Sequence, residues 1–125
     1  MNIFLIEDDT IYSDFIRKTL SRDSSYKIQA FYTAEDALAA MDGALPDVMI
    51  IDYKLPGISG IELFEKLKSK VTDLTKVIML SALDDGNMVL SFIQKGVRDY
   101  VIKDENVIES LKAILEGNGD DYLFS

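Results

Sequence analysis

Apolar runs broken by turn residues recur along this chain and predict five strands, each followed by a helix. The expected strands are residues 2–6, 26–31, 48–52, 76–80 and 99–102. The runs at 2–6, 48–52 and 76–80 are short and nearly unbroken, which is typical of strands buried on both faces of a sheet. The run at 26–31 alternates only weakly, so we expect it at an edge of the sheet.

The segments between these strands carry apolar residues at helical spacing. The expected helices are residues 10–20, 34–41, 61–67, 87–95 and 107–115. In the first helix, we expect the buried face to consist of Ile11, Phe15, Ile16 and Leu20. Asp9 is expected to cap the N-terminus of the same helix.

This alternation of strands and helices predicts an α/β fold with a parallel sheet, right-handed crossovers and helices on both faces. A chain of 125 residues is long enough for one domain with its own core, and no repeat or internal boundary divides it. No apolar run approaches the length of a membrane span, and the N-terminus lacks the pattern of a signal peptide. We therefore expect a cytoplasmic protein that makes no contact with a membrane.

The composition narrows the chemistry, because the chain contains no cysteine and no histidine. Disulfides, thiolate or histidine catalysis, and metal sites built on these side chains are thereby excluded. Carboxylates, hydroxyls and lysines remain as functional groups. The net charge of −9 argues against direct binding of nucleic acid by this domain.

Polar residues of a particular kind follow the predicted strands. Glu7 and Asp8 come after the first strand, Asp52 ends the third, Ser81 follows the fourth and Lys103 follows the fifth. Because parallel strands end at one edge of a sheet, we expect these side chains to meet there. Crowded carboxylates repel one another, and Mg²⁺ would relieve that repulsion. A carboxylate nucleophile with a hard cation, a hydroxyl and a lysine suits phosphoryl transfer.

Four motifs stand at the ends of the predicted strands: IEDD at residues 6–9, DYKLPGISG at 52–60, MLSA at 79–82 and DYVIK at 99–103. Together they resemble the response regulator receiver domain of two-component signalling, of the chemotaxis-receiver type. The resemblance implies a flavodoxin-like fold with strand order 2-1-3-4-5. It covers about residues 2–116, so we expect a receiver domain at 1–116. Residues 117–125 are then a tail or the start of a linker to an output domain.

The resemblance also implies roles for the acidic residues. Asp52 would accept a phosphoryl group from the phosphohistidine of a histidine kinase or phosphotransfer protein. Glu7 and Asp8 would hold Mg²⁺ together with Asp52 and the backbone carbonyl of Lys54. The domain would thus be a signalling phosphoacceptor, with slow self-dephosphorylation at most, and not an enzyme.

The remaining roles implied by the resemblance concern the response to phosphorylation. Ser81 would hydrogen-bond a phosphoryl oxygen, and Lys103 would neutralise its charge. Tyr100 would change rotamer together with Ser81 and thereby alter a surface formed by the fourth helix, the fifth strand and the fifth helix. A partner protein or a second copy of the chain could bind that surface.

One position departs from the family pattern. The family usually has a proline with a cis peptide bond after the lysine, whereas Asp104 follows Lys103 here. A cis bond before a residue other than proline costs roughly 2.5–4 kcal/mol. Either this loop is strained or the bond is trans, and the aim of Lys103 depends on which holds.

Other interpretations remain open. Glu7 and Asp8 could serve only as helix-dipole residues, and Tyr100 could be an ordinary strand tyrosine. A pseudo-receiver would bind proteins without accepting phosphate. A metal-dependent phosphatase of the haloacid-dehalogenase type would need a second aspartate two residues after Asp52, where Lys54 stands.

Overall fold

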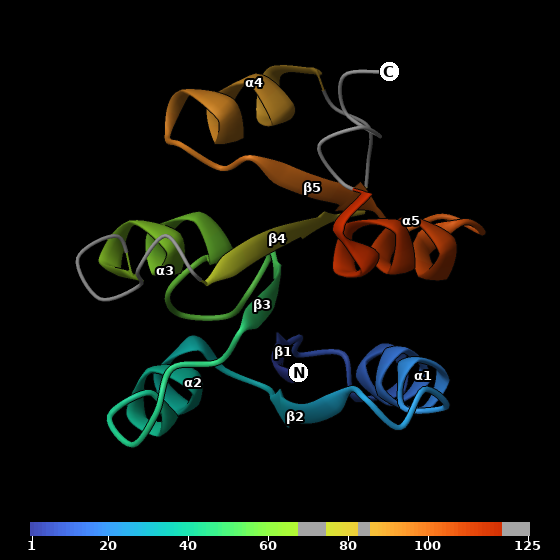
Figure 1. Ribbon diagram of the computed structural model, residues 1–125. Helices are drawn as coiled ribbons and strands as arrows, with labels where there is room; N and C mark the ends of the chain where they lie inside the picture. Colours follow the sequence, from blue (N-terminus) through green and yellow to red (C-terminus); the bar gives the residue numbers. More distant parts are fainter. Residues whose placement is uncertain (68–74, 83–85, 119–125) are drawn as a thin grey trace.

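A single parallel sheet of five strands forms the centre of the molecule. The computed structural model describes residues 1–67, 75–82 and 86–118. The strand order is β2-β1-β3-β4-β5, which confirms the predicted flavodoxin-like arrangement (Figure 1). The strands are β1 (Asn2–Ile6), β2 (Lys27–Phe31), β3 (Val48–Asp52), β4 (Lys76–Ser81) and β5 (Asp99–Ile102).

Helices cover both faces of the sheet, as predicted (Figure 1). One face carries α1 (Thr10–Leu20) and α5 (Val107–Ala113), which continues into η1 (Ile114–Asn118). The opposite face carries α2 (Ala34–Ala40), α3 (Gly60–Leu67) and α4 (Gly86–Gln94). Within the described part of the chain, every helix is too short or too polar to span a membrane. Of the tail or linker expected at residues 117–125, the first two residues belong to η1, and residues 119–125 lie outside the described residues.

The central strands supply apolar side chains to both faces, so the core is divided into two layers. All the residues of β3 are buried, whereas β2 is half-exposed at the edge of the sheet, as its weak alternation predicted. Ile50, Leu80 and Val101 belong to the layer beneath α1 and α5. Met49 and Met79 belong to the opposite layer. Residues two apart along a strand therefore share one face, which fixes where each strand-end side chain points.

The predicted buried face of α1 is wrong in part. Ile16 and Leu20 are buried as expected, but Ile11 is 82% exposed and Phe15 is 47% exposed. At 3.6 residues per turn, Ile11 lies roughly 140° around the helix axis from Ile16, so the two residues cannot face the sheet together. The small side chain of Ser13 completes the buried stripe instead.

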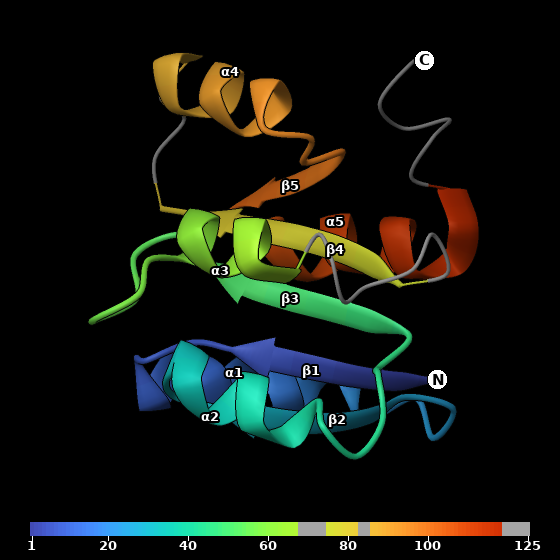
Figure 2. The same ribbon diagram turned by 90° about the vertical axis from the view of Figure 1, so that its left-hand side faces the viewer.

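The carboxyl ends of the strands all lie at one edge of the sheet (Figure 2). Asp52 stands beside Leu80 in the register of β3 and β4, and Ser81 stands beside Ile102 in the register of β4 and β5. The residue after β5, Lys103, donates its backbone N–H to the carbonyl of Ser81 at 2.8 Å. The backbone positions of Asp52, Ser81 and Lys103 therefore lie on adjacent strands at the same end of the sheet.

Candidate functional site

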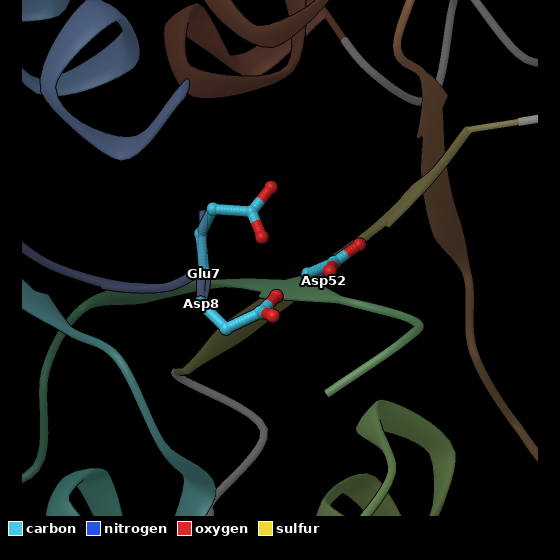
Figure 3. A group of neighbouring side chains, drawn as sticks. All are labelled: Glu7, Asp8 and Asp52. Atoms are coloured by element: carbon cyan, nitrogen blue, oxygen red, sulfur yellow. The ribbon is translucent and has the colours of Figure 1, made fainter. Parts of the chain in front are cut away.

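Three carboxylates meet at this edge of the sheet (Figure 3). Glu7 and Asp8 follow β1 directly, and Asp52 is the last residue of β3. One carboxylate oxygen from each residue lies within 4.8 Å of the other two. Glu7 and Asp52 are only 1% and 5% exposed, whereas Asp8 is exposed. The predicted acidic cluster is therefore present, with one wall open to solvent.

Lys103 reaches into this cluster from the end of β5. Its ammonium forms a hydrogen-bonded ion pair with Glu7 Oε1 and lies 3.1 Å from Asp52 Oδ1. Glu7, Asp52 and Lys103 each lie two residues after a strand residue that faces α1 and α5. Because side chains two apart share a face, the three side chains lie on the same side of the sheet. The cation thus bridges the two buried carboxylates of the cluster.

Burial and neighbouring charges shift the pKa values of Glu7 and Lys103. Burial raises the pKa of Glu7 from 4.5 to about 7, against the lowering effect of the hydrogen bond from Lys103, and the nearby charge of Asp52 adds to the rise. Burial alone would lower the pKa of Lys103, but the hydrogen bond that it donates to Glu7 and the charge of Asp52 together raise it. The lysine therefore stays cationic, while a second cation would favour ionisation of Glu7.

Local hydrogen bonds hold the acidic loop after β1 in place. The backbone N–H of Glu7 donates to the carbonyl of Phe31 at 3.0 Å, which ties this loop to β2. Asp9 Oδ1 accepts from the N–H groups of Ile11 and Tyr12 at 3.0 and 3.1 Å, which confirms the predicted N-cap of α1. Asp9 thus serves the helix, and its two acidic neighbours are left to the cluster.

The loop after Asp52 depends on a glycine that sequence reasoning passed over. A Cβ atom on Gly60 would lie 2.3 Å from the carbonyl oxygen of Asp52, so only glycine fits here without a shift of backbone. The N–H of Gly60 also donates to the carbonyl of Tyr53 at 3.0 Å. The glycine that ends the DYKLPGISG motif was visible in the sequence, but its close contact with the strand was not.

Lys54 lies two residues beyond Asp52, and its side chain is exposed. Its backbone carbonyl as a magnesium ligand stays a prediction.

Ser81 and Tyr100 occupy the opposite face of the sheet from Lys103. Ser81 is the buried last residue of β4. It lies two residues after Met79, so the two side chains share one face of the sheet. Tyr100, which is paired with Met79 in the register of β4 and β5, is half-buried and packs against the same core layer. The predicted switch residues are thus diagonal neighbours on adjacent strands, close to α4 in the fold.

The peptide bond after Lys103 is trans, as are all the peptide bonds of the described residues. The N–H of Asp104 donates to the carbonyl of Ile102 at 2.9 Å, a hydrogen bond that a proline could not make. Asp104 Oδ1 accepts from the N–H of Asn106 at 2.9 Å and so fixes the turn before α5. Of the two possibilities left by the sequence, the structure has the trans bond, and Lys103 still reaches the cluster.

The donor set fits a hard divalent cation. Mg²⁺ prefers oxygen ligands and is commonly held by one or two carboxylates, with water or phosphate oxygens completing its coordination. Here two buried carboxylates and one exposed carboxylate offer such oxygens on the open side of the cluster. The ammonium of Lys103 lies beside them and could pair with a bound anion. The arrangement is that of a flavodoxin-like α/β protein with an acidic cluster at the carboxyl ends of its strands.

The family model of the response regulator receiver domain matches residues 3–115. This chain therefore belongs to the receiver domains of two-component signalling, which use Mg²⁺ and interact with kinases and phosphotransfer proteins. The resemblance inferred from the four motifs is thereby confirmed.

Curated relatives and solved structures agree with this assignment. Chemotaxis protein CheY of Listeria monocytogenes is 32% identical over 114 residues, covering 86% of this chain and 93% of CheY. The probable transcriptional regulatory protein NarL of Mycobacterium tuberculosis is 28% identical, and the match covers 88% of this chain but only 51% of NarL. The BeF3-activated DrrB receiver domain superposes with a TM-score of 0.77 at 30% identity, covering 92% of this chain and 97% of that domain.

Proposed function

We propose that this receiver domain accepts a phosphoryl group on Asp52 from the phosphohistidine of a histidine kinase or phosphotransfer protein. One observation carries the proposal: the buried carboxylate of Asp52 belongs to the acidic cluster, and its Oδ1 lies 3.1 Å from the ammonium of Lys103. A carboxylate placed in this way can act as a nucleophile while fixed charges stabilise the oxygens that gain charge.

In the proposed step, an oxygen of Asp52 attacks the phosphorus atom. The new O–P bond forms as the N–P bond to the histidine breaks, and the leaving imidazole keeps the electron pair. Lys103 stabilises the phosphoryl oxygens with a hydrogen bond and a positive charge. Glu7 and Asp8, with Asp52 and the carbonyl of Lys54, would hold Mg²⁺. When bound, this cation neutralises phosphoryl charge.

The test is the formation of an adduct with acetyl phosphate in the presence of Mg²⁺. We expect one adduct on Asp52, located by borohydride trapping and mass spectrometry, and none in Asp52→Asn. Asp8→Asn should lose most of the reaction. Asp9→Asn is the matched control, because the same substitution one residue away keeps a good helix cap and lies outside the cluster. Label on another carboxylate, or none with fresh donor, would contradict the proposal and favour the pseudo-receiver.

We also propose that Ser81 transmits the phosphorylation of Asp52 to Tyr100. Support comes from the position of the two residues on one face of adjacent strands, with Ser81 buried and Tyr100 half-buried. If the Ser81 hydroxyl moved toward the phosphoryl group, it would vacate space beside Tyr100. The charge of the phosphoryl group would then bias the choice between two rotamers of Tyr100.

The measurement for this switch is the amide NMR spectrum with and without beryllofluoride. The protein and Ser81→Ala should both bind beryllofluoride at Asp52, but only the former should show shift changes that spread around Tyr100. Equal changes in both proteins would refute a role for Ser81 in transmission.

The surface that would respond consists of α4, β5 and α5. Leu90 and Ile93 of α4 are 53% and 57% exposed, and Gln94 and Arg98 are exposed beside them. Lys95, which follows α4, is partly exposed and forms an ion pair with Glu65 of α3 at 2.6 Å. We propose that this mixed apolar and polar surface binds a partner or a second copy of the chain. Sedimentation with and without beryllofluoride would distinguish the two.

A further inference from the structure

The ammonium of Lys103 has a third neighbour, the ring of Tyr12. Lys103 Nζ lies 4.7 Å from the centroid of this ring, which comes from the first turn of α1. That distance is within the range in which a cation is attracted to the face of an aromatic ring. The contact joins the first helix to the end of the fifth strand across the acidic cluster.

The ring of Tyr12 is held by its own surroundings. Asp9 Oδ1 accepts the backbone N–H of Tyr12 at 3.1 Å, so the helix cap also fixes the turn that carries the ring. The ring packs against the core layer beneath α1 and α5 and lies at 6.0 Å and 52° to the ring of Phe15. Burial also raises the pKa of Tyr12 above 10, so the ring stays neutral at physiological pH.

The hydroxyl of Tyr12 does not account for this placement. Its oxygen is buried and has no hydrogen-bond partner among the described residues. A tyrosine selected for a hydrogen bond at this point would be expected to make one. The contribution of this side chain is therefore its ring, and the face of the ring is turned to the ammonium.

The ring also differs from the other two neighbours of the ammonium. Glu7 and Asp52 hold Lys103 before phosphorylation, but on the proposed function both change partners when a cation and a phosphoryl group arrive. The four-carbon stem of a lysine leaves its head free to move once those partners are lost. The ring of Tyr12 is uncharged and binds neither group, so its contact with the ammonium can persist through the reaction.

We propose that Tyr12 is a positioning residue, which keeps the ammonium of Lys103 aimed at the phosphoryl group on Asp52 through the face of its ring. This inference rests on the proposed function of Asp52 for its kinetic consequence, but the contact itself can be tested separately.

The structural arm of the test is NMR of the Lys103 side chain. In the unaltered protein, the ε-methylene protons should be shifted upfield by the ring current, and Tyr12→Phe should retain that shift. Tyr12→Leu should lose it, whereas Tyr26→Leu should not affect it. Tyr26 is the matched control, since it is a half-buried tyrosine packed against the same core layer. An unshifted signal in the unaltered protein would overturn the proposal without any variant.

The kinetic arm is the initial rate of adduct formation with acetyl phosphate at saturating Mg²⁺. Tyr12→Leu should slow the reaction roughly fivefold, with little change in the half-saturating donor concentration, because one cation–π contact is lost. Tyr12→Phe should restore the rate. In the Lys103→Ala background, Tyr12→Leu should have no further effect.

A fivefold loss that persists in Lys103→Ala would show that the ring acts through the fold, and this would overturn the proposal. An unchanged rate in Tyr12→Leu would do the same. If the unaltered protein forms no adduct at all, the proposed function fails, and the NMR arm alone then decides whether Tyr12 holds Lys103.

Discussion

The buried carboxyl of Glu7 should make the metal-free protein less stable as the pH rises. Its pKa is raised from 4.5 to about 7, chiefly by burial, so the folded state binds this proton more tightly than the unfolded state. The resulting stability is fully present below about pH 4.5 and is lost as the pH rises through about 7. Between about pH 5 and pH 8, the loss should reach roughly 2 kcal/mol.

This pH window isolates Glu7 from the other described groups whose pKa is shifted. Hydrogen bonds from Ser25 lower the pKa of Asp23, so its titration falls below the window. Burial raises the pKa of Tyr26 above 10. Burial alone would lower the pKa of Lys103, but the hydrogen bond that it donates to Glu7 and the charge of Asp52 together raise it from 10.5. Both groups therefore titrate above the window, as does Tyr12, whose pKa is also raised by burial.

The assay is urea unfolding across this window, with and without Mg²⁺. Glu7→Gln keeps the shape of the side chain and removes the titration, so its free energy of unfolding should vary far less with pH. Glu105→Gln, the same change at an exposed position outside the cluster, should keep the slope of the unaltered protein. Mg²⁺ should flatten the slope by favouring the ionised carboxylate. Equal slopes in Glu7→Gln and the unaltered protein would refute the reasoning.

Three further substitutions test the scaffold by chemical denaturation. Gly60→Ala should cost roughly 1–3 kcal/mol, because its methyl carbon would lie 2.3 Å from a backbone oxygen of β3. Ile16→Ala should cost roughly 2–5 kcal/mol while Ile11→Ala stays within about 0.5 kcal/mol, and comparable losses would contradict the corrected face of α1. Asp104→Pro should cost roughly 1 kcal/mol or more by removing an N–H that donates to β5, and an unchanged midpoint would contradict that.

The strands and the acidic cluster could be predicted because each depends on a short-range signal and one rule of topology. The apolar runs located β1 and β3, and parallel strands end at one edge, so Glu7 and Asp52 were expected to meet there. The family resemblance implied the strand order that places β1 beside β3. The side chains that α1 turns inward could not be predicted in the same way. Ile11 and Phe15 are apolar, but the angle at which the helix docks on the sheet decides which stripe is buried, and that angle is absent from the local pattern.

The same reasoning explains why Tyr12 escaped notice while Lys103 did not. A lysine directly after a strand is recognisable from its position, whereas the meeting of Tyr12 with Lys103 depends on how α1 and β5 lie relative to each other in space. The departure at Asp104 raised the question of what aims the lysine in this chain. The answer combines two contacts: Asp104 fixes the backbone with its N–H and its carboxylate, and the aromatic ring confines the ammonium at the far end of the stem. Neither contact involves a proline, so the lysine can reach Asp52 from a trans backbone.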